Sequence, residues 1–231
     1  MAGNEKDVEK EFSLLTPELE ALAAAEEAAD AAAKARIEAM QPGDVLGEVT
    51  SVNISAKKGQ RKTPIASGVM EVRADYGCAD DAHASDAWHR QISLLAEESI
   101  KKAQNRGLTV KEGDFAENIT TRGFMPFFIP IGTVLQVGDI RIEVSQVGKV
   151  CHTRCAIYYL AGDCIFPREG IFFEVVTGGT VSVGDSIIVT KMGDGHCQYT
   201  PQEALDEIAK VRAEEAAEKA AKAKEVATAN A

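Results

Sequence analysis

The sequence predicts a mainly β domain with some α-helix, placed between two alanine-rich helical segments. Residues 1–41 and 200–231, here called the N-terminal and C-terminal arms, are dominated by alanine, glutamate and lysine, which favour helix. Residues 42–199 instead contain short runs of Val, Ile, Phe and Thr, separated by the Gly-Asp and Pro-Gly pairs of turns. Repeated Val-Gly-Asp turns at 137–139 and 183–185 suit the hairpins of a compact single-domain barrel.

Each arm is predicted to contain one helix with a thin apolar stripe. Thr16 and Pro17 supply an N-cap and a first-turn residue for a helix that runs to Met40, and Pro42-Gly43 ends it. The C-terminal arm starts at Thr200, which has capping-box spacing to a glutamate. Few large apolar residues lie in either arm, so two interpretations remain: a dimerisation arm that would give a homodimer, or a solvated helical extension, which is favoured.

The middle segment, residues 42–199, is predicted to form one domain of short strands. A single helix near residues 91–105 interrupts them. The expected strands lie in six apolar runs: VLGEVTSVNI, SGVMEVRA, TVLQVGDIRIEVSQVG, AIYYLA, IFFEVVTGG and SIIVTKM.

Charge and cysteine content narrow the class of protein. The net charge is −11, and the arms carry most of it: ten acids and four bases in the first, seven acids and five bases in the second. This distribution gives no support to a nucleic-acid binder. The sequence has no apolar stretch of membrane-spanning length and no apolar signal core at its start, so we expect a cytoplasmic protein without a membrane partner. The five cysteines, an odd and clustered set, are then expected to be thiols.

The densest group of chemically reactive residues lies at 148–172. If the strand that begins before Gly148 continues, Cys151, Thr153 and Cys155 share one face. Nearby bases favour the reactive thiolate form of cysteine, and a thiolate also suits a metal–sulfur centre. Buried structural cysteines are the other interpretation. A zinc site is disfavoured because a second close Cys or His pair is missing. The group comprises Cys151, Cys155, Cys164, Lys149, His152, Arg154, Arg168 and Glu169.

Several motifs in consistent order resemble the MOSC domain family, named for the C-terminal domain of molybdenum cofactor sulfurase. Residues 145–185 resemble the C-terminal core of these domains, and residues 47–62, 81–99 and 113–124 resemble the segments that precede it. The resemblance covers about residues 43–192 and implies a MOSC-type β-barrel. It also places His83 and the run Trp88-His89-Arg90 near the pocket. Asp81 with His83 is either a proton-handling pair or, as we favour, a loop-holding contact.

The resemblance implies that Cys155 is the working thiol and the metal ligand. It places contacts to the cofactor at Asn118, Thr153 and Ser93, while Ala116 stands where the enzyme motif has an arginine. The pterin cofactor carries a phosphate, so cationic donors are expected near it. The candidate cations are Lys57, Lys58, Arg61, Lys62, Lys149 and Arg154.

The implied function is binding of the molybdenum cofactor, molybdopterin, or transfer of sulfur to it. The alternatives are a cofactor-free persulfide carrier for metal–sulfur cluster assembly, and a reductase of N-hydroxylated compounds that needs a separate electron donor. The expected partners are the pterin cofactor, or a cysteine desulfurase acting in trans, with a molybdoenzyme as acceptor. The chain contains no pyridoxal phosphate site of its own, so any sulfur donor acts in trans.

Overall fold

The computed structural model describes residues 17–149, 157 and 164–195. The chain forms two compact units, Met1–Met40 and Gln41–Ala231. The first unit contains α2 (Pro17–Glu38), a 22-residue helix that confirms the predicted N-terminal one. On the surface of α2, the exposed residues Lys34 and Glu38 are separated by one helical turn and form an ion pair. Lys34 Nζ lies 3.9 Å from Glu38 Oε1. The predicted helix of the C-terminal arm lies outside the described residues. No helix in the described ranges is both long and apolar enough to cross a membrane.

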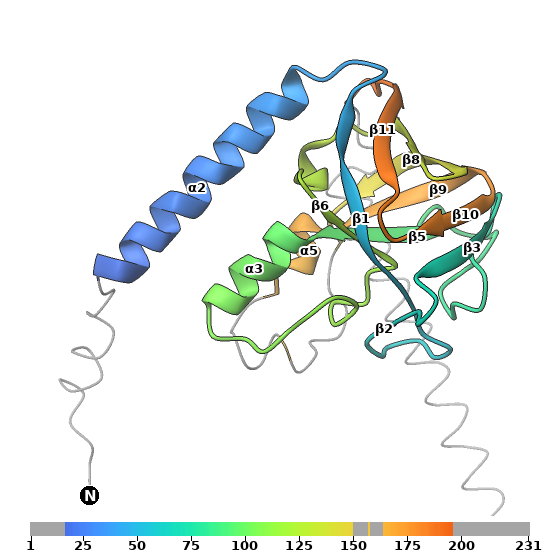
Figure 1. The fold of residues 1–231 in the computed structure, drawn as a ribbon, viewed down its shortest axis with the longest axis horizontal. Coiled ribbons are helices and arrows are strands. Elements are labelled where there is room, and N and C mark those ends of the chain that lie inside the picture. The colour runs from blue at the N-terminus through green and yellow to red at the C-terminus, as the bar shows by residue number, and fades with distance from the viewer. Residues whose placement is uncertain (1–16, 150–156, 158–163, 196–231) are drawn as a thin grey trace, which may run out of the picture. The chain divides into compact units, whose positions relative to one another are not determined.

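The second unit contains a closed barrel of seven strands, as the sequence predicted (Figure 1). Around the ring the order is β1, β11, β7, β8, β9, β5 and β6, and the β1–β11 pairing closes it. Every pairing is antiparallel except β5 with β6. The strands of the ring are β1 (Val45–Ile54), β5 (Ile92–Ala96), β6 (Ile119–Arg122), β7 (Val134–Val137), β8 (Ile140–Val147), β9 (Ile171–Thr177) and β11 (Ser186–Lys191).

Smaller elements extend the barrel. The two-residue strand β2 (Thr63–Pro64) pairs with the end of β1. A second sheet of three strands, in the order β10-β3-β4, comprises β3 (Val69–Arg73), β4 (Gly77–Cys78) and β10 (Gly179–Ser182). The helical elements in the described part of this unit include α3 (Glu97–Asn105), the 3-10 turn η1 (Pro126–Phe128) and α5 (Phe166–Glu169).

One of the two Val-Gly-Asp turns forms the predicted hairpin. Gly138 and Asp139 join β7 to β8, where Val137 faces Ile140, and Gly138 has a positive φ of 56°. The prediction is wrong for residues 183–185. There β10 pairs with β3, whereas the following strand, β11, pairs with β7 and β1. The turn therefore passes from the small sheet to the barrel, because its two flanking strands find partners in different sheets.

The helix predicted near residues 91–105 is only partly correct, because the first part of this segment is a strand. Ile92–Ala96 form β5, and the helix α3 begins only at Glu97. Every residue of β5 is buried. A strand covered on both faces lacks the alternation of polar and apolar residues, so its pattern cannot be told from the start of a buried helix.

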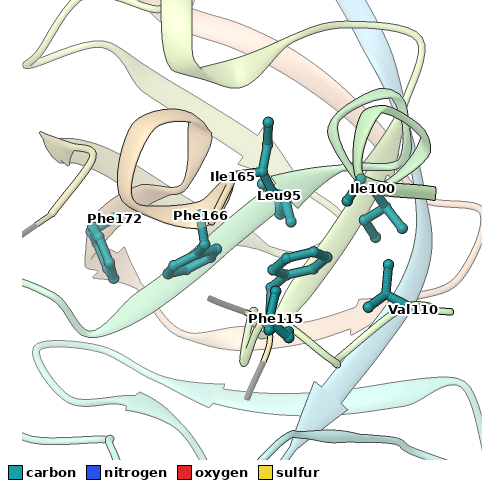
Figure 2. Close-up of a cluster of buried hydrophobic side chains, with 9 residues drawn as sticks. Leu95, Ile100, Val110, Phe115, Ile165, Phe166 and Phe172 are labelled. Carbon is teal, nitrogen blue, oxygen red and sulfur yellow. The ribbon is translucent and has the colours of Figure 1, made fainter. Parts of the chain in front are cut away.

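A cluster of buried side chains packs under α3 and α5 beside β5 (Figure 2). Phe166 and Phe172 meet edge to face, with ring centres 5.8 Å apart. Lys102 of α3 and Glu169 of α5 form a buried ion pair of 2.9 Å, which ties the two helices together. This cluster, called the α3–α5 cluster below, comprises Leu95, Ile100, Ala103, Val110, Phe115, Ile157, Ile165, Phe166 and Phe172.

Candidate functional site

A cavity of about 430 Å³ opens against the α3–α5 cluster, with which it shares Phe166 and Phe172. Its walls come from the turn after β1, the loop between β4 and β5, the start of β6, the end of β8 and the α5–β9 region. The lining residues are Lys58, Lys62, His83, Ser85, Ala87, Trp88, Arg90, Ser93, Ala116, Asn118, Lys149, Phe166 and Phe172.

The lining is positively charged although the chain carries a net charge of −11. Four of its residues are cations, namely Lys58, Lys62, Arg90 and Lys149, and no Asp or Glu is found among the described residues that line it. Walls of one charge sign in a partly enclosed site concentrate ligands of the opposite sign. The cavity is therefore suited to an anion.

Ser93 and Asn118 fix the floor where β5 and β6 run side by side. The Oδ1 atom of Asn118 accepts hydrogen bonds from the backbone N–H of Ser93 at 3.1 Å and from its hydroxyl at 3.0 Å. The Asn118 amide in turn donates to the backbone oxygen of Asn53 at 3.3 Å. Both side chains line the cavity. Most of the hydrogen-bonding capacity of the Asn118 side-chain amide is used in these bonds, which connect β1, β5 and β6.

Behind this floor lies a buried carboxyl group, that of Glu117. Its Oε1 atom accepts hydrogen bonds from the backbone N–H of Gly113 at 2.5 Å and from the hydroxyl of Thr120 at 3.0 Å. Its Oε2 atom is buried and has no hydrogen-bond partner. Burial opposes ionisation more strongly than these donors favour it, and it raises the pKa of Glu117 to about 7.

A buried ion pair forms one side of the cavity. Lys62 Nζ lies 2.6 Å from Asp81 Oδ2, and both side chains are 2% exposed. Asp81 also accepts hydrogen bonds from the backbone N–H groups of Ser55, at 3.0 Å, and His83, at 2.9 Å. Burial disfavours the Asp81 charge, but the bonds from His83 and Lys62 and the charge of Lys62 outweigh it and hold the pKa of Asp81 well below its usual range.

The opposite side of the cavity alternates aromatic rings and cations. The Arg90 guanidinium carbon lies 5.1 Å from the ring centre of Trp88 and 5.3 Å from that of Phe172. The ammonium of Lys149 lies 5.1 Å from the ring centre of Phe166 and 6.0 Å from that of Phe172. Cation–π contacts of this kind hold long side chains in place. The two cations are thus presented to the cavity from defined positions.

Gln146, near the end of β8, connects this wall to the chain that leads towards residue 150. Its Oε1 atom lies 2.8 Å from His89 Nε2 and accepts a hydrogen bond from Arg90 Nε at 2.9 Å. Its amide donates to the backbone oxygen of Gly148 at 2.7 Å. One amide side chain therefore holds the loop before β5 and the backbone after β8 together.

The strand β8 does not continue beyond Val147, which corrects the premise of an extended strand through Gly148. Gly148 has a φ of 68°, a conformation that interrupts a strand. The backbone N–H groups of Gly148 and Lys149 donate to the oxygens of Gly170 and Pro167, at 2.7 and 3.0 Å. The shared face expected for Cys151, Thr153 and Cys155 concerns residues outside the described ranges and stays a prediction.

Replacing Gly148 by alanine is expected to destabilise the protein by more than about 1 kcal/mol. The substitution combines an unfavourable φ with a clash, because an added Cβ would lie 2.6 Å from the backbone oxygen of Pro167. Urea unfolding measures the effect. The matched control is Gly59→Ala, which also has a positive φ but meets nothing within 4 Å. Equal losses in the two variants would show that the Pro167 contact costs nothing.

Ala116, at the position of the missing arginine, has strained backbone. It lines the cavity with a φ of 68°, which is uncommon for a residue other than glycine. Its backbone oxygen accepts a hydrogen bond from the Ser93 hydroxyl at 3.3 Å. Residue 116 therefore contributes a backbone oxygen to the site and no charged side chain.

The structure brings together five of the residues predicted to contact the cofactor: Ser93, Asn118, Lys58, Lys62 and Lys149 all line the cavity. Two others do not line it: Lys57 is exposed, and Arg61 pairs with Asp114 at 3.2 Å. Thr153, Arg154 and Cys155, with the neighbouring Cys151 and His152, lie outside the described residues.

Some lining and supporting residues were not predicted. Phe166, Phe172 and Gln146 belong to apolar or strand-like sequence, and nothing in their types distinguishes them from ordinary core or strand residues. Cys78 is buried, and burial raises the pKa of its thiol to about 12. Cys164 is half-buried against the α3–α5 cluster.

Comparisons with known proteins agree with this architecture. Residues 79–188 match the family model of the MOSC domain. The structure of YuaD from Bacillus subtilis is 15% identical, with a TM-score of 0.51, and the match covers 62% of this chain and 94% of that one. YiiM from Escherichia coli is 18% identical, with a TM-score of 0.44, over 69% of this chain and 74% of that one. None of the curated proteins matches the sequence. The family model therefore identifies a MOSC domain at residues 79–188 of the chain.

Proposed function

We propose that the chain binds the molybdenum cofactor in its cationic cavity and that Cys155 acts as the metal ligand or as the carrier of a sulfur atom. MOSC domains are associated with the molybdenum cofactor, in sulfur-transfer or reductase chemistry. The observation that carries the proposal is the cavity itself, a positively charged site of about 430 Å³ in an acidic chain.

The donors of the cavity fit the chemistry of this cofactor. A pterin phosphate needs cationic or N–H donors for its phosphate and a flat apolar surface for its ring. Lys58 and Lys62 on one side, with Arg90 and Lys149 on the other, would hold the phosphate. Phe172, 6% exposed between the two cations of that wall, would keep water from the ring.

The residues of the chain bind and orient, whereas the cofactor, when bound, supplies a metal that changes its oxidation state. Ser93 and Asn118 would keep β5 and β6 at a fixed spacing beneath the ligand. Ile157, two residues after Cys155 in the sequence, packs in the α3–α5 cluster together with Phe166 and Phe172 of the cavity wall. Cys155 itself lies outside the described residues, and its assignment to the site rests on the resemblance to MOSC domains.

Ala116 favours a second candidate function, a persulfide carrier that holds no cofactor. A carrier needs no phosphate contact, and the residue at the motif position of the arginine contributes no charge. In that case Cys155 would receive sulfur from a cysteine desulfurase acting in trans and pass it to a molybdoenzyme or a metal–sulfur cluster. Phosphate binding distinguishes the two functions.

We expect Cys155→Ser to abolish loading. The full chain would be purified anaerobically from a host that makes the molybdenum cofactor, and molybdenum, pterin fluorescence and labile sulfur would be measured on the same sample. Molybdenum and pterin together, lost in Cys155→Ser, support cofactor binding and make reduction of N-hydroxylated compounds the next assay. Labile sulfur alone, lost in the same variant, supports the carrier. The matched control is Cys164→Ser, which should keep its load. Loading that survives in Cys155→Ser contradicts the role of this thiol.

A further inference from the structure

His83 is a second chemically distinctive group of the cavity. Its side chain is 41% exposed and also lines the cavity, so it can contact both solvent and a ligand bound in the cavity. Histidine is the side chain that ordinarily gains and loses a proton near neutral pH, and His83 is the one histidine among the described lining residues. The other basic groups of the lining are Lys and Arg, which keep their charge at that pH.

A fixed carboxylate orients this imidazole. His83 Nδ1 lies 3.5 Å from Asp81 Oδ1, and the His83 backbone N–H donates to the same oxygen at 2.9 Å. With Nδ1 directed to the carboxylate, Nε2 is the nitrogen left for exchange with a ligand. Lys62 binds the other oxygen, Oδ2, at 2.6 Å and keeps Asp81 ionised. A carboxylate held in this way stabilises the protonated imidazole.

The charges around His83 have opposing effects. Asp81, in its own loop, favours the protonated form, whereas Lys58 and Lys62 from the turn after β1, and Arg90 and Lys149 across the cavity, disfavour it. A doubly charged anion in the cavity offsets the repulsion from these four cations. Protonation of the imidazole and binding of the anion therefore strengthen each other.

We propose that His83 takes up a proton from solvent when an oxyanion occupies the cavity and holds that proton against the bound ligand. Asp81 is the positioning residue for His83, and Lys62 is the counter-ion of Asp81. The imidazole exchanges this proton with solvent through its exposed side. The inference rests on the anion site of the proposed function and adds a proton-exchanging residue to it.

Sulfate is a suitable probe because it remains a dianion between pH 6 and pH 8.5. Its affinity for the full chain would be measured across that range at constant ionic strength, with the fluorescence of Trp88, the single tryptophan and a cavity residue, as the reporter. Calorimetry in two buffers of different ionisation enthalpy would count the protons taken up. We expect uptake of up to one proton, and affinity that falls by as much as about tenfold per pH unit on the alkaline side.

His83→Gln is expected to bind sulfate with a nearly flat pH profile and without proton uptake. The variant keeps the backbone bond to Asp81 and the Lys62–Asp81 pair, so the anion site itself remains. The control, Lys57→Gln, removes an exposed basic group that does not line the cavity and should keep the profile. A pH dependence that survives in His83→Gln, a flat profile in the natural chain, or no sulfate binding would each overturn the proposal. None of these results would contradict cofactor binding if molybdenum and pterin are found in the purified protein. The sulfate experiment can therefore fail while the proposed function holds.

Discussion

Lys62→Met is expected to lower the free energy of unfolding by about 3 to 5 kcal/mol. Lys62 and Asp81 are both 2% exposed in their side chains, and their charged atoms lie 2.6 Å apart. Removing the ammonium leaves a buried carboxylate without its counter-ion, and water cannot reach Asp81 to replace it. Urea unfolding at pH 7.5, followed by the fluorescence of Trp88 and by circular dichroism, measures the loss.

Lys57→Met is the matched control, because it removes the same kind of charge from the same turn. Lys57 is exposed, and we expect a change within about 0.5 kcal/mol. The double variant Lys62→Met with Asp81→Asn should recover part of the loss, since it removes the unpaired charge and the single Asn oxygen still accepts one of the two backbone N–H groups, that of Ser55 or that of His83. Equal stabilities of Lys62→Met and Lys57→Met would show that the buried pair does not stabilise the fold.

The same turn shows what sequence can and cannot predict about this site. Lys57, Lys58, Arg61 and Lys62 look alike as a basic run in the sequence, and two of them, Lys58 and Lys62, line the cavity. Their roles differ because the turn places one lysine against Asp81 and another at the cavity, and leaves Lys57 in solvent. The partner of Lys62 is 19 residues away, and spacing along the chain carries no information about such a contact.

The fold was more predictable than the site. Strand β3 alternates buried and exposed positions, and strands β7 and β8 meet at a Gly-Asp turn, and both signals are local. The strand β5 was not predicted because it is buried on both faces. The turn at 183–185 was wrongly predicted as a hairpin because its flanking strands pair with strands that are distant in sequence. The cavity depends on several such non-local placements at once, which explains why Gln146 and Phe172 were not foreseen.

Glu117→Gln is expected to make the protein more stable at alkaline pH by about 3 kcal/mol, with little change at pH 4. Burial raises the pKa of Glu117 from its ordinary value of 4.5 to about 7. Below pH 4.5 the folded and the unfolded chain both hold the proton. Between 4.5 and 7 the unfolded chain releases its proton while the folded chain keeps it, so the free energy of unfolding falls as pH rises, and above 7 the loss is complete.

Glutamine has the shape of glutamate and keeps an oxygen for the Gly113 N–H and the Thr120 hydroxyl, but it carries no charge at any of these pH values. The difference between the natural chain and Glu117→Gln, measured by urea unfolding at pH 4, 6 and 8, isolates this group from every other titrating residue. The control is the exposed Glu174→Gln, which removes a carboxylate in contact with solvent and should differ from the natural chain by the same amount at all three pH values. A constant difference across the three pH values would mean that Glu117 is ionised in the fold and that a cation or ordered water satisfies its Oε2 atom.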